Sequence, residues 1–250
     1  MKADAKAAYD AFASDYDAFT HEYRYERWTK RLLRKAEEAG LQGKSLLDVA
    51  CGTGLSFLPM LDRGFRVTAC DISERMLDIA RAKAGEKARL LKADMRALPD
   101  LGAFDLVWAV NDPINYLLSV TELEATLEGF KRNLGPGGIA LFDVSTLLTY
   151  RTFFSREVVV ERDGRRLVWQ GQSVPDRVRP GSFHEARFEA EGEAGSEHVH
   201  RQRHFAEEEI LACIETAGMT CAGVFGELKG ALFAGLDEEV HTKAVYLCRA

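Results

Sequence analysis

Short apolar runs alternate with helical patterns between residues 41 and 144. The runs carry almost no polar position, and each ends at a glycine, an aspartate or a cluster of turn residues. Strands that are apolar throughout and alternate with helices are typical of a parallel sheet covered on both faces. The predicted strands are residues 45–50, 65–70, 89–92, 104–110 and 139–144, and the intervening helices end near residues 63, 84 and 133.

The pattern differs on either side of this region. Two helical patterns, residues 3–19 and 24–39, predict an N-terminal helical cap over residues 1–40. Between residues 151 and 204 four β-like runs separated by Gly, Pro and Asp predict an inserted antiparallel sheet, which we expect to act as a lid or specificity element. A helix at 206–217 and strands near 219–226 and 244–249 complete an α/β domain of residues 41–150 and 205–250.

The predicted fold is therefore a doubly wound, mainly parallel sheet of seven strands with a helical cap and an antiparallel insertion. The chain has 250 residues, 46% of them hydrophobic, and a net charge of −6 that disfavours a nucleic-acid partner. It has no apolar stretch of the ~20 residues that a membrane span needs and no secretion signal, so we expect a cytoplasmic protein. Five scattered cysteines predict no metal site, and a homodimer is left open.

Glycines and acidic residues follow the first three predicted strands. Gly52 and Gly54 allow a sharp turn and a close approach of a ligand, and Asp71 stands 71 − 52 = 19 residues after Gly52. In an open parallel sheet, ligands lie beyond the carboxyl ends of the strands. A carboxylate at Asp71 is suited to ribose hydroxyls and one at Asp94 to the amine of adenine, so the sequence predicts an adenosine site.

Two cofactors contain adenosine and suit such a site, a nicotinamide dinucleotide and S-adenosylmethionine. The dinucleotide fingerprint G-x-G-x-x-G requires a third glycine where this chain has Phe57. Asp48 adds a negative charge that is unfavourable for a pyrophosphate and favourable for the cationic methionine end of S-adenosylmethionine. The loop therefore favours S-adenosylmethionine.

The segment Asp48-Val49-Ala50-Cys51-Gly52-Thr53-Gly54 resembles the D-x-A-x-G-x-G signature of class I S-adenosylmethionine-dependent methyltransferases of the small-molecule type. Ala93-Asp94-Met95 and the glycine-rich residues 134–138 extend the resemblance. It implies a Rossmann-like methyltransferase fold, S-adenosyl-L-methionine as cofactor and S-adenosyl-L-homocysteine as product. The cofactor-binding residues that we expect are Tyr16, Trp28, Asp48, Ala50, Gly52, Gly54, Asp71, Ile72, Met76, Asp94, Met95 and Asn111.

Tyr16 and Trp28 are included as aromatic cap residues, because the opening helices also resemble those that close over the cofactor in small-molecule methyltransferases. An aromatic face near a sulfonium gains about 0.5 to 2 kcal/mol by cation–π attraction. The other aromatic residues of the opening helices are predicted to belong to the core, and they are Tyr9, Phe12, Phe19, Tyr23 and Tyr25.

Residues 111–116 lie after the fourth predicted strand and contain Asp112-Pro113. Ile114 and Asn115 do not match the D/N-P-P-Y/F motif of nucleic-acid and protein amide methyltransferases, which disfavours base methylation. On the acceptor side we expect Asn115, Tyr116 and Arg203 to bind substrate. The candidate general bases are His200, His204 and Asp143.

The sequence thus predicts an enzyme that moves a methyl group to an O, N or C atom of a small molecule, such as a natural product, a sugar or a metabolite. Two alternatives stay open. One is an NAD(P)-dependent oxidoreductase with a Rossmann fold, and the other is a regulator that binds S-adenosylmethionine without catalysis.

Overall fold

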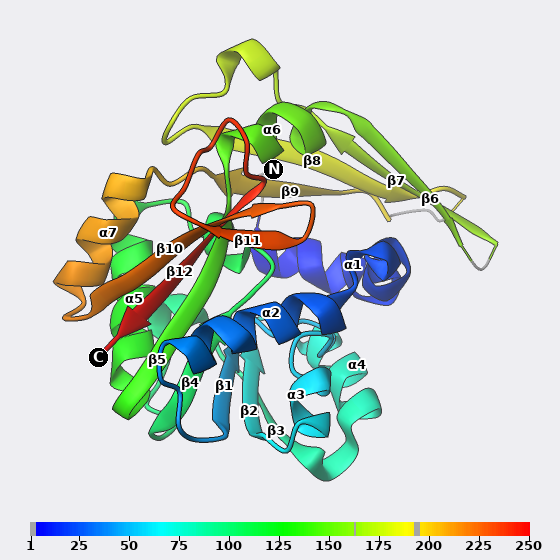
Figure 1. The fold of residues 1–250 in the computed structure, drawn as a ribbon. Helices are drawn as coiled ribbons and strands as arrows, with labels where there is room; N and C mark the ends of the chain where they lie inside the picture. Colours follow the sequence, from blue (N-terminus) through cyan, green and yellow to red (C-terminus); the bar gives the residue numbers. More distant parts are fainter. Residues whose placement is uncertain (1–3, 163, 193–195) are drawn as a thin grey trace.

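The computed structural model describes residues 4–162, 164–192 and 196–250, which form two β-sheets and the helices around them (Figure 1). The main sheet has the order β11-β10-β12-β5-β4-β1-β2-β3. The five strands from β5 to β3 are parallel, whereas β12 and β10 run antiparallel to their neighbours. The strands are β1 (Ser45–Val49), β2 (Arg66–Asp71), β3 (Ala88–Lys92), β4 (Phe104–Ala109), β5 (Leu134–Ser145), β10 (Thr220–Leu228), β11 (Ala231–Ala234) and β12 (Lys243–Arg249).

The predicted fold class is confirmed, and all seven predicted strands are present. The short strand β11 was not predicted; it pairs antiparallel with β10 at the edge of the sheet and makes an eighth strand. Its four residues carry no alternation of buried and exposed positions, since one is partly buried and three are exposed. Its residues are all apolar, but a run of four is too short for a periodic pattern to identify it as a strand.

Helices cover both faces of the main sheet. Ser73 and Ser119 begin α4 and α5 as N-caps, since each hydroxyl accepts a hydrogen bond from a backbone N–H in the first turn. The α-helices are α1 (Ala5–Phe19), α2 (Tyr25–Glu38), α3 (Leu58–Asp62), α4 (Glu74–Ala84), α5 (Val120–Arg132), α6 (Leu147–Thr152) and α7 (Glu207–Thr216). Short 3₁₀ helices are η1 (His21–Tyr23), η2 (Gly85–Lys87), η3 (Met95–Ala97), η4 (Pro113–Tyr116), η5 (Phe153–Ser155) and η6 (Pro175–Arg177). Within the described ranges, no helix is long and apolar enough to cross a bilayer.

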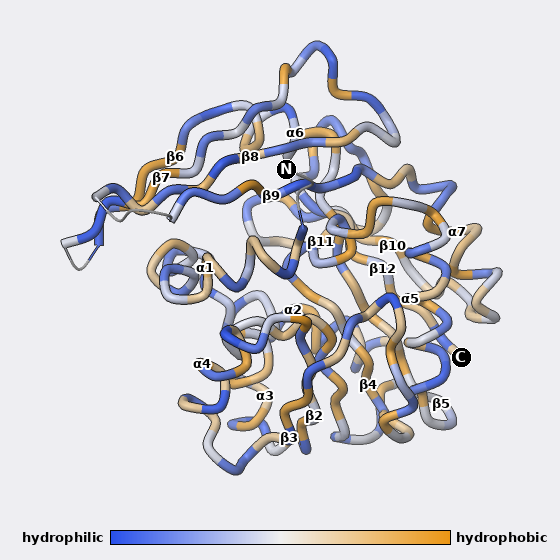
Figure 2. The backbone as a smooth tube through the Cα atoms, turned by 180° about the vertical axis from the view of Figure 1, so that it is seen from behind, coloured by the Kyte–Doolittle hydropathy of each residue, from blue (hydrophilic) through white to orange (hydrophobic). Residues whose placement is uncertain are grey.

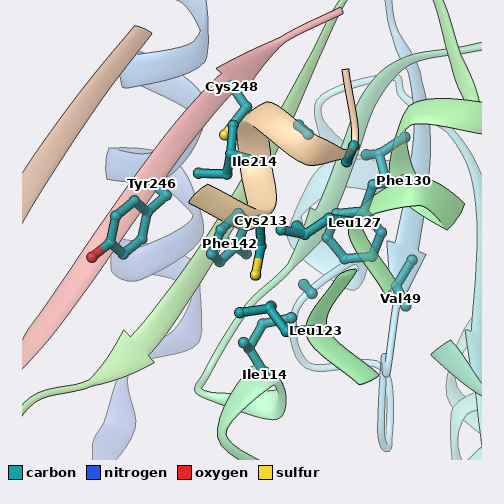
Figure 3. Packing of buried hydrophobic residues seen from close by; sticks show 14 of the residues in the cluster. Val49, Ile114, Leu123, Leu127, Phe130, Phe142, Cys213, Ile214, Tyr246 and Cys248 are labelled. Atoms are coloured by element: carbon teal, nitrogen blue, oxygen red, sulfur yellow. The ribbon is translucent and has the colours of Figure 1, made fainter. Parts of the chain in front are cut away.

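Alternate residues of the parallel strands pack into two cores on opposite faces of the sheet. Leu46 and Leu106 belong to the core under α2, α3 and α4, whereas Leu47 and Val107 belong to the core under α5 and α7. Figure 3 shows the second of these, where side chains from α5 and α7 meet those of β5 and β12. Because both faces of the central strands are buried, these strands are mostly apolar, which is the pattern that the sequence showed (Figure 2).

The second sheet consists of four antiparallel strands in the order β6-β7-β8-β9. They are β6 (Glu157–Arg162), β7 (Arg165–Gly171), β8 (Phe183–Ala190) and β9 (His198–Arg203). In Figure 1 this sheet lies above the main sheet, with α1 below it, and a third core of aromatic and aliphatic side chains joins α1, α6, η5 and the sheet. The helices α6 and η5, which connect β5 to β6, were not predicted.

A substitution of Gly171, at the end of β7, tests how closely η5 packs against the second sheet. A Cβ atom there would lie 2.2 Å from the carbonyl carbon and oxygen of Phe154 in η5, so backbone would have to move. We expect Gly171→Ala to lower the free energy of unfolding by about 3 kcal/mol, at the upper end of overpacking costs. Urea unfolding measures this, with the exposed neighbour Gln170→Ala as control, which should change stability by less than about 0.5 kcal/mol. Equal stability of the two variants would contradict the packing described.

Candidate active site

The loop after β1 turns sharply between Ala50 and Gly54. Ala50, Gly52 and Gly54 have φ angles of 58°, 54° and 90°, in the left-handed region that favours glycine. A Cβ on Gly52 would meet no heavy atom within 4 Å, whereas a Cβ on Gly54 would lie 2.9 Å from the ring of Phe57. Gly52 therefore faces open space, and Gly54 permits close packing of the loop on Phe57.

Asp71 at the end of β2 fixes this loop. Its carboxylate accepts a hydrogen bond of 2.8 Å from the backbone N–H of Gly52 and another of 2.8 Å from the N–H of Ser73. Burial raises the pKa of Asp71 to about 6, although these backbone donors oppose the rise. Each oxygen keeps a lone pair, because a carboxylate has about four acceptor positions.

A first cavity of about 640 Å³ lies over Gly52 and Asp71, at the carboxyl ends of β1, β2 and β4. Seven of the predicted cofactor-binding residues line it, namely Tyr16, Ala50, Gly52, Asp71, Ile72, Met95 and Asn111. Residues that the prediction did not include, Tyr9 and Tyr25 among them, also line it. The parallel strands thus bring these residues together as expected for an open α/β sheet.

Asp94 lies in a smaller cavity of about 400 Å³ that shares Ala50, Ile72 and Met95 with the first. Its carboxylate forms an ion pair of 2.6 Å with the guanidinium of Arg96. Burial alone would raise the pKa of Asp94, but Arg96 more than offsets this and holds the pKa below its ordinary value. Asp94 is therefore a carboxylate in the smaller cavity, next to the first cavity that Asp71 lines.

The other four predicted cofactor-binding residues do not line either of these cavities. The Trp28 indole is turned away and donates to Asp143 at 3.1 Å, and Met76 is fully buried beneath the start of α4. Gly54 packs on Phe57, as described above. In this structure Trp28, Met76 and Gly54 thus contact protein atoms outside these two cavities, and their expected cofactor contacts stay predictions.

Asp48, the fourth of these residues, is fully buried behind the loop. One oxygen accepts a hydrogen bond of 2.5 Å from Ser56, and the other has no hydrogen-bond partner among the described residues. Burial raises the pKa of Asp48 to about 7, against the opposing effect of Ser56. The expected fixed negative charge next to the methionine end is therefore replaced by a carboxyl that is half neutral at pH 7.

A second cavity of about 1370 Å³ extends from the first toward the second sheet. The two cavities share Tyr9, Tyr16, Asn111 and Tyr116, which define the junction between them. Aromatic side chains form much of the remaining wall. They come from α1, η1, η5 and β7 and are Phe12, Phe19, Tyr23, Phe153, Phe154 and Trp169. The prediction that Tyr9, Phe12, Phe19 and Tyr23 belong only to the core is thus incomplete.

Hydrogen bonds order the polar groups at the junction. The hydroxyl groups of Tyr16 and Tyr25 lie 2.5 Å apart, and Asn111 donates to Tyr25 at 2.7 Å and to Tyr16 at 3.3 Å. The ammonium of Lys243 in turn donates to the Asn111 side-chain oxygen at 2.9 Å. Tyr25 and Lys243 were not predicted as site residues, because only the fold brings them next to Asn111.

Lys243 also joins a buried ionic network below the junction. Its ammonium lies 2.7 Å from Asp112 and 3.6 Å from Asp143. Asp143 accepts further hydrogen bonds from Trp28 and from the backbone N–H of Asp112, and it lines neither cavity. Asp143 is therefore held in this ionic network, and its expected role as a base stays a prediction.

His200 lies in the wall of the second cavity, as expected for a residue near the acceptor. Its Nδ1 is 2.9 Å from the hydroxyl of Tyr116, while Nε2 is buried and has no polar partner in the described part of the chain. Burial, with a smaller contribution from the neighbouring His198, lowers the pKa of His200 to about 3. The imidazole is therefore neutral and a weak base.

The remaining predicted residues have structural contacts outside the cavities. His204 Nε2 lies 2.6 Å from Glu238, and Arg203 forms an ion pair of 2.7 Å with Glu209. Asn115 is fully buried, donates to the backbone carbonyl of Arg203 and accepts from the N–H of Ser145. Neither the base role of His204 nor the substrate contacts of Asn115 and Arg203 agree with these positions, whereas Tyr116 does line both cavities.

Comparisons with known proteins agree with this geometry. Residues 46–138 match the family described as methyltransferase domain. A putative methyltransferase of Geobacillus sp. (strain WCH70) is 31% identical over 85% of this chain and 89% of its own. The cypemycin N-terminal methyltransferase of Streptomyces sp. is 28% identical over 80% and 82%. The crystal structure of an S-adenosylmethionine-dependent methyltransferase from Clostridium acetobutylicum ATCC 824 superposes with a TM-score of 0.78 at 22% identity, covering 96% of this chain and 98% of that one.

The buried carboxyl of Asp48 predicts a pH-dependent stability. Below about pH 4 it is protonated in the folded and the unfolded chain, whereas near pH 8 ionisation costs the folded chain on the order of 4 kcal/mol, at 1.36 kcal/mol per pKa unit. Its neutral form thus stabilises the protein at low pH, and this advantage is lost as the pH rises through 7. Asp48→Asn stays neutral, so we expect its stability relative to wild type to rise by that amount between pH 4 and pH 8.

Urea unfolding at the two pH values measures this difference. Asp78→Asn, on the exposed side of α4, is the matched control and should show no such rise. A difference between Asp48→Asn and wild type that is the same at both pH values would show that Asp48 is ionised in the folded protein.

Proposed function

This chain belongs to the S-adenosylmethionine-dependent methyltransferases, and we propose that it methylates a neutral amine nitrogen of a small molecule held in the second cavity. Membership in this family makes it an enzyme and sets aside the oxidoreductase and the non-catalytic regulator. The observation that carries the proposal is the junction, where Tyr9, Tyr16, Asn111 and Tyr116 face both cavities.

The first cavity fits S-adenosylmethionine. In this proposal Asp71 accepts the ribose hydroxyls, Asp94 faces the adenine amine, and the open side of Gly52 leaves room for the methionine end. When bound, this cofactor supplies a methyl group on a positively charged sulfur. Tyr16 at the junction presents an aromatic ring, and a cation near such a face is stabilised by about 0.5 to 2 kcal/mol.

The second cavity suits an acceptor with a ring or another flat apolar part. Phe12, Phe19 and Trp169 offer aromatic faces, and Asn111 and Asp112 place polar atoms where this cavity meets the first. We propose that residues 151–204 serve as the lid of this cavity, since Trp169 and His200 come from that sheet. Holding the nucleophile against the methyl group is the main task, and alignment supplies up to about 7 to 11 kcal/mol in well-oriented reactions.

An amine is favoured over a hydroxyl because the carboxylate at the junction, Asp112, is neutralised by the ammonium of Lys243 at 2.7 Å. One oxygen of Asp112 accepts from Lys243 and the other from Gln202, and His200 is a weak base. Burial raises the pKa of Tyr9, Tyr16 and Tyr116, so their hydroxyls keep their protons. A hydroxyl acceptor needs a base, whereas a neutral amine already has a free lone pair.

The cypemycin relative, which its name describes as an N-terminal methyltransferase, supports a nitrogen acceptor. The match with this relative covers 80% of this chain. The acceptor class that we propose is therefore a primary or secondary amine on a sugar, a peptide end or another natural product, in its unprotonated form.

The role of Asp71 is tested by Asp71→Asn. We expect this variant to bind S-adenosylhomocysteine about 1.5 to 3 kcal/mol more weakly, the usual contribution of hydrogen bonds to a charged group. Isothermal titration calorimetry measures the dissociation constant, and Asp78→Asn, on the exposed side of the following helix, should leave it unchanged. An unaltered affinity of Asp71→Asn would remove Asp71 from the binding site.

The nitrogen acceptor is tested with pairs of ring compounds that share a skeleton and differ in bearing an amine or a hydroxyl. With S-adenosylmethionine present, release of S-adenosylhomocysteine should be at least about 100-fold faster for the amine, the lower end of what a general base contributes to a hydroxyl. Below the amine's own pKa, the rate should rise about tenfold per pH unit. Equal or faster reaction of the hydroxyl compounds would overturn the proposal.

A further inference from the structure

Tyr116 and His200 form a pair across the two parts of the site. Tyr116 ends η4, beyond β4, and His200 lies on β9 in the second sheet, yet the hydroxyl and Nδ1 are 2.9 Å apart. A hydrogen bond between these atoms has two possible directions. Either the phenol donates to the imidazole, or the imidazole donates to the phenol.

The surroundings of the other ring nitrogen decide the direction. Nε2 is buried without a polar partner among the described residues, and the ring is surrounded by aromatic side chains. The ring centroids of Tyr9 and Phe12 lie 5.3 and 5.4 Å from the centroid of the imidazole, at interplanar angles of 83° and 74°. An N–H edge is attracted by the negative face of an aromatic ring, whereas a lone pair is repelled by it.

Nε2 therefore carries the proton of the neutral imidazole, and Nδ1 is the acceptor. The doubly protonated form is excluded because burial lowers the pKa of His200 to about 3. Two other side chains lie near the phenol. The Gln202 oxygen already accepts from Tyr150 and its nitrogen donates to Asp112. The Tyr9 hydroxyl acts toward Tyr116 as a donor, so that burial and this contact raise the pKa of Tyr9. The phenol proton of Tyr116 is thus directed to His200.

We propose that His200 is a positioning residue that binds the hydroxyl proton of Tyr116, so that the Tyr116 oxygen accepts an N–H from the acceptor amine. This inference rests on the proposed amine acceptor. A phenol with an unbound proton would donate it to the amine nitrogen and occupy the lone pair that must attack the methyl group. With the proton held by His200, the phenol oxygen instead orients the amine and leaves its lone pair free.

The tautomer is tested directly by nitrogen NMR of the protein labelled with ¹⁵N-histidine and saturated with S-adenosylhomocysteine. His200 is assigned by the signals that disappear in His200→Gln. We expect a pyrrole-type shift at Nε2 and a pyridine-type shift at Nδ1, both unchanged between pH 6 and pH 8. The opposite tautomer, or an imidazolium, would overturn the inference, and this readout does not depend on any acceptor.

Kinetics with the amine found in the panel test the consequence. His200→Phe keeps an aromatic ring at this position but cannot accept a hydrogen bond from the Tyr116 hydroxyl. We therefore expect kcat to fall about 10-fold or more, while the affinity for S-adenosylhomocysteine stays within twofold of wild type. His200→Gln retains an acceptor and should recover most of kcat. A double variant with Tyr116→Phe should be no slower than the slower single variant, because both changes remove one interaction.

A purely structural role gives the reverse order, with His200→Phe near wild type and His200→Gln impaired, and would overturn the inference. If His200 were instead a general base, the pH dependence of kcat would be lost in both His200→Phe and His200→Gln, and this result would also overturn the inference. His184→Gln, a buried histidine on β8 outside both cavities, is the matched control and should keep its kcat. If wild type methylates only hydroxyl compounds, the proposed function fails while the NMR result still stands.

Discussion

The carboxylate of Asp71, held by the backbone N–H groups of Gly52 and Ser73, is the contact on which the site depends. β1 and β2 are parallel neighbours, so the loops that follow them leave the sheet at the same edge, and one side chain can reach both. Burying a carboxylate is costly unless hydrogen bonds satisfy it, and the raised pKa of Asp71 shows that part of this cost remains. The loop is thereby fixed in a conformation that has positive φ angles and an open side at Gly52.

A second constraint is the set of hydrogen bonds that fixes Asn111 and Asp112 at the junction. Asn111 and Asp112 both have positive φ angles, 74° and 57°, which Asn and Asp tolerate better than most residues but at some cost. The ammonium of Lys243 binds both side chains, and Gln202 of β9 binds the second oxygen of Asp112. Because these bonds connect β4, β12 and the second sheet, the wall of the acceptor cavity is tied to the loop that borders the cofactor cavity.

Local signals explain which features could be predicted from the sequence. The apolar strands and the loop glycines depend on residues close in the chain, and the predicted Asp71, Ile72 and Asn111 do line the first cavity. Asp143 and His204 were selected as bases for their chemical type, and the fold places Asp143 in an ion pair with Lys243 and His204 in a hydrogen bond with Glu238. Lys243 had no local signal at all.

The aromatic side chains of α1 did carry a signal. Tyr9, Phe12, Tyr16 and Phe19 follow one another at spacings of three and four, which places them on one face of the helix. That face was interpreted as core for all but Tyr16, and it does pack against the second sheet. Only the position of α1 below that sheet shows that the same stripe also borders both cavities.

The aromatic stripe and the neutral His200 suit the charge balance of the proposed reaction. Transfer to a neutral amine conserves the total charge, because the positive charge leaves sulfur and appears on nitrogen. A site for this reaction needs no strong proton acceptor during the transfer, but it must tolerate a cation on either side of the junction. Aromatic faces attract a cation without competing for its methyl group as a nucleophile. The buried imidazole is too weakly basic to take up a second proton, so it adds no repulsive charge. The same surroundings that make His200 a poor base therefore make it suitable for orienting Tyr116.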